Sequence, residues 1–169
     1  CQHTENNPET FQQAMTYITD DLSQMPPLHE DTNLDSLLNL SKYSTAMKTL
    51  LKNKQLIQIL RNMYDNDALP CSKRRKLANI YSNIMKNSYN VDTLLNEDPE
   101  TFKVIGKKVS TAQNVLKDDE DVDIAETEIE TVVTIMKDDN NYNQLTTNQL
   151  ISDNELTECV KVYTGANKR

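Results

Sequence analysis

The stretch DPETFKVIGKKVSTAQNVL, residues 98–116, decides the fold class. Asp98 can cap a helix whose first position is Pro99, a residue tolerated there because the first turn leaves its amide groups unpaired anyway. The apolar residues that follow recur at steps of three and four: Phe102, Ile105, Val109, Ala112 and Leu116. This spacing places them on one face of an α-helix, so we predict an amphipathic helix that buries that face.

Similar apolar stripes recur along the rest of the chain. They predict helices that begin at Pro8, near Asn33, near Leu56, at Ser72, near Val122 and at Ser152. The segment from about residue 33 to residue 52 should break near Ser41. The last helix starts at a capping box, Ser152-x-x-Glu155, and Gly165 stands where a C-terminal cap belongs.

No segment alternates between apolar and polar residues at period two, so no strand is predicted. We therefore predict an all-α protein, a compact bundle of about seven amphipathic helices. A short helical solenoid is less favoured, because no repeat recurs at a fixed period of about 33–47 residues. Residues 1–7 are predicted to be a flexible N-terminal segment. Residues 8–169 would form one all-α domain, or two packed halves at 8–90 and 91–169.

The composition limits the classes of function. The chain has 169 residues, but only two are glycine and two are histidine. Two glycines cannot build a Gly-rich phosphate loop or a dinucleotide-binding turn. No apolar run approaches the roughly 18 residues that a transmembrane helix needs. His3 and His29 lack a histidine partner at helical spacing and belong to no zinc signature, so we predict a protein that is not an enzyme and holds no cofactor.

The three cysteines and the N-terminus bear on the compartment. A start at Cys1 fits the mature form of a cleaved secreted precursor, a truncated chain, or a lipoprotein that carries its lipid on this residue. In a secreted protein we expect a Cys71–Cys159 disulfide, with Cys1 left for a lipid, a partner or a dimer through a second copy of the chain. Three reduced thiols in a cytoplasmic protein are the alternative. The single N-glycosylation sequon, at Asn39, agrees with secretion.

Two weak metal-site patterns occur. A true N-terminus with His3 at the third position can form a square-planar site for Cu(II) or Ni(II), so His3 is a weak metal candidate. The acidic run from Asp118 to Asp123 resembles a calcium-binding loop in its spacing. Ile124 stands where that loop needs glycine, however, and helical acids are the better interpretation.

The basic run Lys73-Arg74-Arg75-Lys76 is the strongest candidate for a partner-binding site. It falls in the first turns of a predicted helix, where four positive charges oppose the helix dipole. A charge pattern that breaks a local rule is typical of a functional surface. The alternatives are a solvated helix face and an internal match to the acidic run near Asp118.

The net charge of −8 is unevenly distributed along the chain. Residues 1–34 carry −6, residues 35–90 carry +7, and residues 91–169 carry −9. We therefore predict a secreted, non-enzymatic all-α binding or effector protein whose basic central surface engages a receptor, a glycan or a small ligand. No nucleic-acid partner is expected from so acidic a chain. The alternatives are an intracellular adaptor for short acidic peptides, and a small hydrophobic-ligand carrier or lipid-anchored surface protein.

Overall fold

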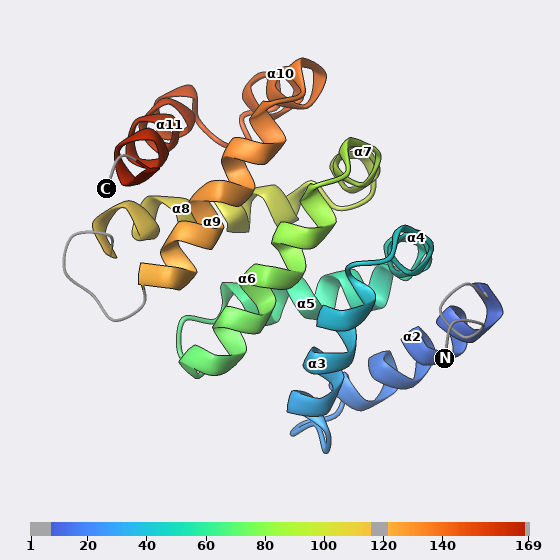
Figure 1. The fold of residues 1–169 in the computed structure, drawn as a ribbon. Helices are drawn as coiled ribbons and strands as arrows, with labels where there is room; N and C mark the ends of the chain where they lie inside the picture. The colour runs from blue at the N-terminus through green and yellow to red at the C-terminus, as the bar shows by residue number, and fades with distance from the viewer. Residues whose placement is uncertain (1–7, 116–121, 168–169) are drawn as a thin grey trace. The chain divides into compact units, whose positions relative to one another are not determined.

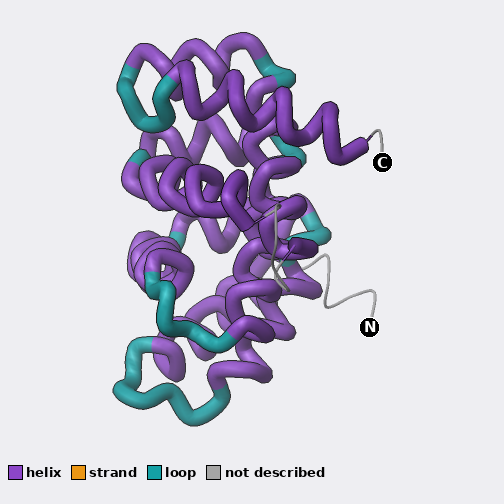
Figure 2. The backbone as a smooth tube through the Cα atoms, turned by 90° about the vertical axis from the view of Figure 1, so that its left-hand side faces the viewer, coloured by secondary structure: helices purple, strands orange, loops and turns teal. Residues whose placement is uncertain are grey.

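The computed structural model describes residues 8–115 and 122–167, and these residues form helices joined by turns and loops, without a strand (Figure 2). The predicted all-α class is confirmed. The described helices are α2 (Pro8–Leu22), α3 (Glu30–Leu40), α4 (Ser44–Lys52), α5 (Lys54–Asp65), α6 (Cys71–Met85), α7 (Ser88–Glu97), α8 (Glu100–Val115), α9 (Val122–Met136), α10 (Asp139–Thr147) and α11 (Asp153–Asn167). The predicted count of about seven is therefore wrong, since the described residues contain ten.

Short helices account for the difference in number. The expected break near Ser41 separates two full helices, α3 and α4, because Ser41 closes α3 and Tyr43 precedes α4 in an extended conformation. Helices α7 and α10 have only 10 and 9 residues, too few to show a long apolar stripe in the sequence. Both begin at a side-chain cap: Asn87 accepts from the Tyr89 amide, and Asp138 accepts from the Asn141 amide.

The chain divides into two compact units, Cys1–Ile84 and Met85–Arg169. In the first unit α2 lies against α3, α4 and α5 (Figure 1). The apolar residues Phe11, Met15, Ile18 and Leu22 recur at steps of three and four and are buried in α2, whereas Met25, the next residue at this spacing, is 97% exposed. Helix α2 ends at Leu22, and the chain turns away from the core there. The rings of Tyr64 and Tyr81 stack at 4.8 Å between their centroids and join α5 to α6.

In the second unit α8, α9 and α11 pack together, and α10 lies against α9 and α7. Apolar residues of the predicted stripes form its core: Phe102, Ile105, Val109, Ala112, Ala125, Ile129, Val132, Leu156 and Cys159. Gly106 lets α8 approach the turn before α11, because a Cβ atom there would lie 3.3 Å from Ile151 Cγ1.

Of the two contacts that define the predicted capping box at the start of α11, the N-cap contact of Ser152 is formed, and the Glu155 carboxylate binds elsewhere. The Glu155 amide donates to Ser152 Oγ over 3.1 Å, as expected of an N-cap. The Glu155 carboxylate accepts instead from Ser110 Oγ of α8, over 3.0 Å. The prediction that Gly165 caps this helix is wrong, because α11 continues through Gly165 to Asn167. The terminus that does turn into the left-handed region is that of α10, where Gln149 has a φ of 56°.

Candidate functional site

The basic run lies at the start of α6, but the cap of that helix differs from the prediction. The amides of Lys73 and Arg74 each donate to the Pro70 carbonyl over 3.0 Å. Helix α6 therefore starts at Cys71, and Ser72 is an exposed residue of its first turn rather than its cap. That turn contains no acidic residue to balance the four cations.

The two lysines of the run are balanced by α3. Lys73 Nζ forms an ion pair with Glu30, the first residue of α3. Lys76 Nζ lies 3.0 Å from Asp35 Oδ1 and 3.6 Å from Asp31 Oδ1. The hydrogen bond that Lys76 donates to Asp35 raises the pKa of Lys76 above its ordinary value, and the two carboxylate charges add to the effect while burial opposes it. Tertiary contacts thus supply the negative charge that the helix itself lacks.

The acidic run near Asp118 was one predicted partner for these lysines. Its residues up to Asp121 lie outside the described residues, so the structure does not place that match. The acids that do pair with the run were missed. They stand about forty residues earlier in the chain, and the net negative charge of residues 1–34 pointed to Glu30 and Asp31 but not to Asp35.

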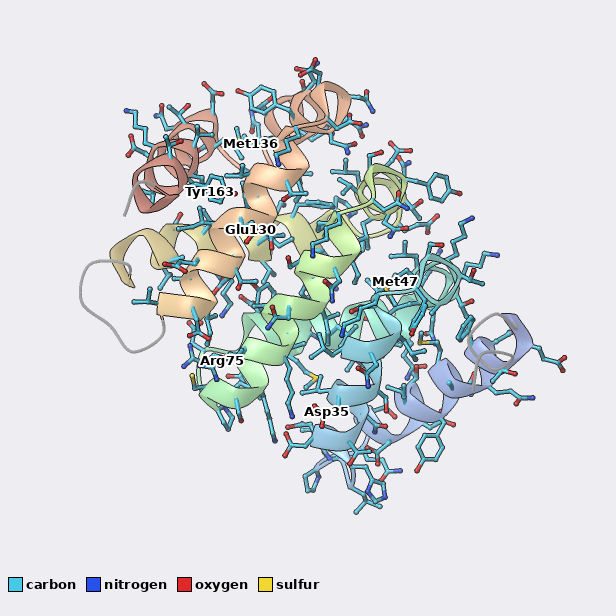
Figure 3. The ribbon with its side chains drawn as sticks, viewed as in Figure 1. Asp35, Met47, Arg75, Glu130, Met136 and Tyr163 are labelled. Atoms are coloured by element: carbon cyan, nitrogen blue, oxygen red, sulfur yellow. The ribbon has the colours of Figure 1, made fainter. Side chains whose placement is uncertain are left out.

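The two arginines of the run bind close to their own helix. Arg74 Nε donates to the Leu69 carbonyl over 3.0 Å, and an Arg75 Nη atom lies 3.7 Å from Cys71 Sγ. All four basic side chains are half-buried rather than fully exposed. Figure 3 shows Arg75 near the start of α6 and Asp35 on α3, both within the first unit. The basic run is thus an ordered part of the surface, and its role in partner binding remains a prediction.

An apolar loop lies next to this surface and was not predicted. It runs over residues 23–29 between α2 and α3, and it presents Met25, 97% exposed, and Leu28, 74% exposed. Glu30, which pairs with Lys73, follows the loop directly. The available signal was the placement of two large apolar residues, Met25 and Leu28, on either side of the Pro26–Pro27 pair, where proline prevents a helix from continuing.

A buried carboxylate holds this loop in place. Asp21 is only 6% exposed, and it accepts hydrogen bonds from the amides of Leu28, over 3.1 Å, and His29, over 3.0 Å. It also accepts from Asn33 Nδ2 over 2.6 Å. Three donors around one buried carboxylate satisfy its charge inside the protein. The loop is therefore exposed and yet firmly attached to both flanking helices.

A groove of about 700 Å³ opens elsewhere on the first unit, between α2, α4 and the start of α5. It is lined by Gln12, Met15, Thr16, Thr49, Lys52, Asn53 and Lys54. Asn53 holds two of its walls together: its Oδ1 caps α5 by accepting from the Leu56 amide, and its Nδ2 donates to Thr19 Oγ1 of α2, each over 3.0 Å. Six of its seven lining residues are polar or charged.

The other predicted site residues lie apart from these surfaces. The expected Cys71–Cys159 disulfide is not formed: Cys159 is completely buried in the core of the second unit, and Cys71 starts α6 in the first. Asn39 is exposed in the last turn of α3, where a glycan could be accommodated. Cys1 and His3 lie outside the described residues. His29 is an exposed loop residue whose amide binds Asp21.

Within the described residues no group of histidine, cysteine and acidic side chains is placed to hold a metal ion. None of the helices described is both long enough and apolar enough to cross a membrane. Comparison of the chain with protein-family models, with curated proteins and with solved structures finds no match.

Proposed function

We propose that this chain is a secreted, non-enzymatic binding protein that recognises a partner through one face of its first unit. This face combines the apolar loop, residues 23–29, with the basic run, Lys73–Lys76. The observation that carries the proposal is the exposure of Met25 and Leu28 on a loop that the buried Asp21 holds in place.

The energetics of the apolar loop support a binding role. Single exposed apolar residues are common on protein surfaces, but two large ones displayed together by an anchored loop are less so. Burying a Met or Leu side chain against a partner contributes about 1.5–3 kcal/mol. Two such side chains in one complementary pocket could therefore supply the centre of an interface.

The basic run supports the same face in a different way. Lys73 and Lys76 fix the start of α6 to α3, so Arg74 and Arg75 lie on an ordered helix of the first unit. Their guanidinium groups can pair with carboxylates or sulfate groups on the rim of a partner. Rim charges chiefly steer association and set its salt dependence.

The test measures binding of labelled protein to cells and secreted fluid of the source organism. We expect saturable binding that Arg74→Glu/Arg75→Glu weakens and makes less dependent on salt. Met25→Ser/Leu28→Ser should abolish it. Tyr89→Ser is the control, because Tyr89 is 61% exposed on the second unit and belongs to neither surface. Unchanged binding by both double variants would refute the proposal.

The compartment needs its own experiment. An intracellular adaptor for acidic peptides would use the same arginines, and a lipid-anchored protein would differ from a secreted one only at Cys1. Mass spectrometry of the native protein separates these alternatives. A glycan at Asn39 is expected of the secreted form, and an unmodified Asn39 with all thiols reduced would favour the intracellular adaptor.

A further inference from the structure

A stretch of the first unit without acidic residues contributes two lysines to the groove. Residues 36–64 contain no aspartate or glutamate, although the whole chain carries a net charge of −8. Five cations lie in this span: Lys42, Lys48, Lys52, Lys54 and Arg61. Two of them, Lys52 and Lys54, line the groove.

The groove presents the functional groups that bind a charged and hydroxylated ligand. None of its seven lining residues is acidic. The two ammonium groups are donors for an oxyanion, and the amides of Gln12 and Asn53 both donate and accept. The hydroxyls of Thr16 and Thr49 donate to the carbonyls of Gln12 and Thr45 in their own helices, so their oxygens can still accept a hydrogen bond.

A second, shallower hollow adjoins the groove along α2. It has a volume of about 510 Å³, shares Gln12 and Thr16 with the groove, and adds Tyr17, 61% exposed, with Glu9, Gln13 and Asp20. An exposed aromatic ring with carboxylates and amides around it suits a neutral sugar, whose C–H face packs on the ring while its hydroxyls donate to the carboxylates. The same carboxylates repel an anion, so an oxyanion would be confined to the lysine end.

We infer that the two hollows together bind a short carbohydrate that carries a sulfate or phosphate ester. The esterified sugar occupies the groove, with its oxyanion at Lys52 and Lys54, and a neutral sugar lies over Tyr17. The groove volume of about 700 Å³ falls within the usual range of small-ligand sites. The inference does not depend on the proposed partner face, because no residue of the apolar loop or the basic run lines either hollow.

Isothermal titration calorimetry of the full chain tests this site. The probes are a neutral disaccharide that carries one sulfate ester, its unsulfated form, glucose 6-phosphate and inorganic sulfate. We expect saturable binding of the sulfated disaccharide, and at least about tenfold weaker binding of the unsulfated form and of inorganic sulfate, because each lacks one half of the ligand. Glucose 6-phosphate should bind with intermediate affinity. Inorganic sulfate that binds as tightly as the disaccharide would overturn the site.

Variants then assign the binding to these residues. Lys52→Gln/Lys54→Gln should weaken the disaccharide at least about tenfold. The matched control is Lys103→Gln/Lys161→Gln, which removes the same charge from exposed lysines of the second unit. Tyr17→Ala should weaken the disaccharide but leave glucose 6-phosphate unchanged. Equal weakening by both lysine pairs would overturn the inference, as would binding to phosphoinositide vesicles without binding to either soluble sugar.

The two proposals fail independently. Arg74→Glu/Arg75→Glu should leave disaccharide binding within about twofold of the unmodified chain, because neither arginine lines the hollows. Loss of disaccharide binding in that variant would instead place the anion at the basic run and overturn the groove assignment. If the same variant binds the sugar but no longer binds the partner, the result supports the proposed function and leaves the groove assignment unchanged.

Discussion

Replacement of Asp21 by asparagine should detach the apolar loop from the first unit. The carboxylate is 6% exposed and uses both oxygens: Oδ1 accepts from the Leu28 amide, and Oδ2 accepts from the His29 amide and from Asn33 Nδ2. An asparagine side chain has one oxygen and one amide nitrogen. In either orientation its NH₂ group therefore faces at least one N–H donor that has lost its acceptor.

The magnitude follows from counting these bonds. A hydrogen bond to a charged group contributes about 1.5–3 kcal/mol, and a buried donor without an acceptor costs about 1–3 kcal/mol. The better orientation of asparagine places its oxygen at the Oδ2 position, which keeps two bonds in weakened, neutral form and loses the bond to Leu28. We therefore expect Asp21→Asn to lower the free energy of unfolding of the first unit by about 2–4 kcal/mol.

Two measurements check this prediction. Urea unfolding followed by circular dichroism gives the loss of stability, and amide hydrogen exchange at Leu28 and His29 reports whether the loop has opened. Asp20→Asn is the matched control: it removes the same charge one residue away from an exposed position, and should change stability by less than about 0.5 kcal/mol. Equal effects of the two variants, with exchange at Leu28 and His29 unaltered, would refute the reasoning.

Three further predictions concern backbone, packing and charge. Gln149→Gly should raise the free energy of unfolding by up to about 1 kcal/mol in urea titration, because glycine adopts the φ of 56° without a Cβ penalty. Gly106→Leu should lower it by about 1–2 kcal/mol, since Ile151 Cγ1 lies 3.3 Å from the Cβ position and the better helix propensity only partly compensates. The pKa of Lys76 is raised in the folded state. The stability from its ion pair is therefore fully present below its unfolded pKa, about 10.4, and is lost as the pH rises through the higher folded value. Lys76→Met should abolish this part of the loss of stability at alkaline pH. Urea unfolding of the unmodified chain and of the variant at several alkaline pH values measures it, and the same pH dependence in both proteins would contradict the prediction.

The helices were predictable where a long stripe met a cap. Residues 98–112 show both signals, and the buried faces of α8 and α9 follow from steps of three and four alone. The end of α2 was not predictable in this way, because Met25 continues the stripe in register. The helix nevertheless ends at Leu22, and Asp21 in its last turn binds the amides of Leu28 and His29, a contact of the folded chain that the local sequence does not show.

Only part of the candidate site was predictable from the sequence, namely the basic run. The basic run is evident from four consecutive letters, but its counter-charges on α3 depend on how α3 and α6 pack, which local sequence does not encode. The groove was missed for the opposite reason. Its lysines are spread over two helices and form no run, and the informative signal was the absence of acidic residues from 36 to 64.

The loop between α2 and α3 is attached at both ends, to Asp21 at the end of α2 and through Glu30 to Lys73 of α6. A segment held in this way loses its conformational entropy when the chain folds rather than when a partner arrives. Association would then require little further ordering of Met25 and Leu28. A partner would meet them already in place, and its affinity would depend on the stability of the first unit as much as on the contacts it makes.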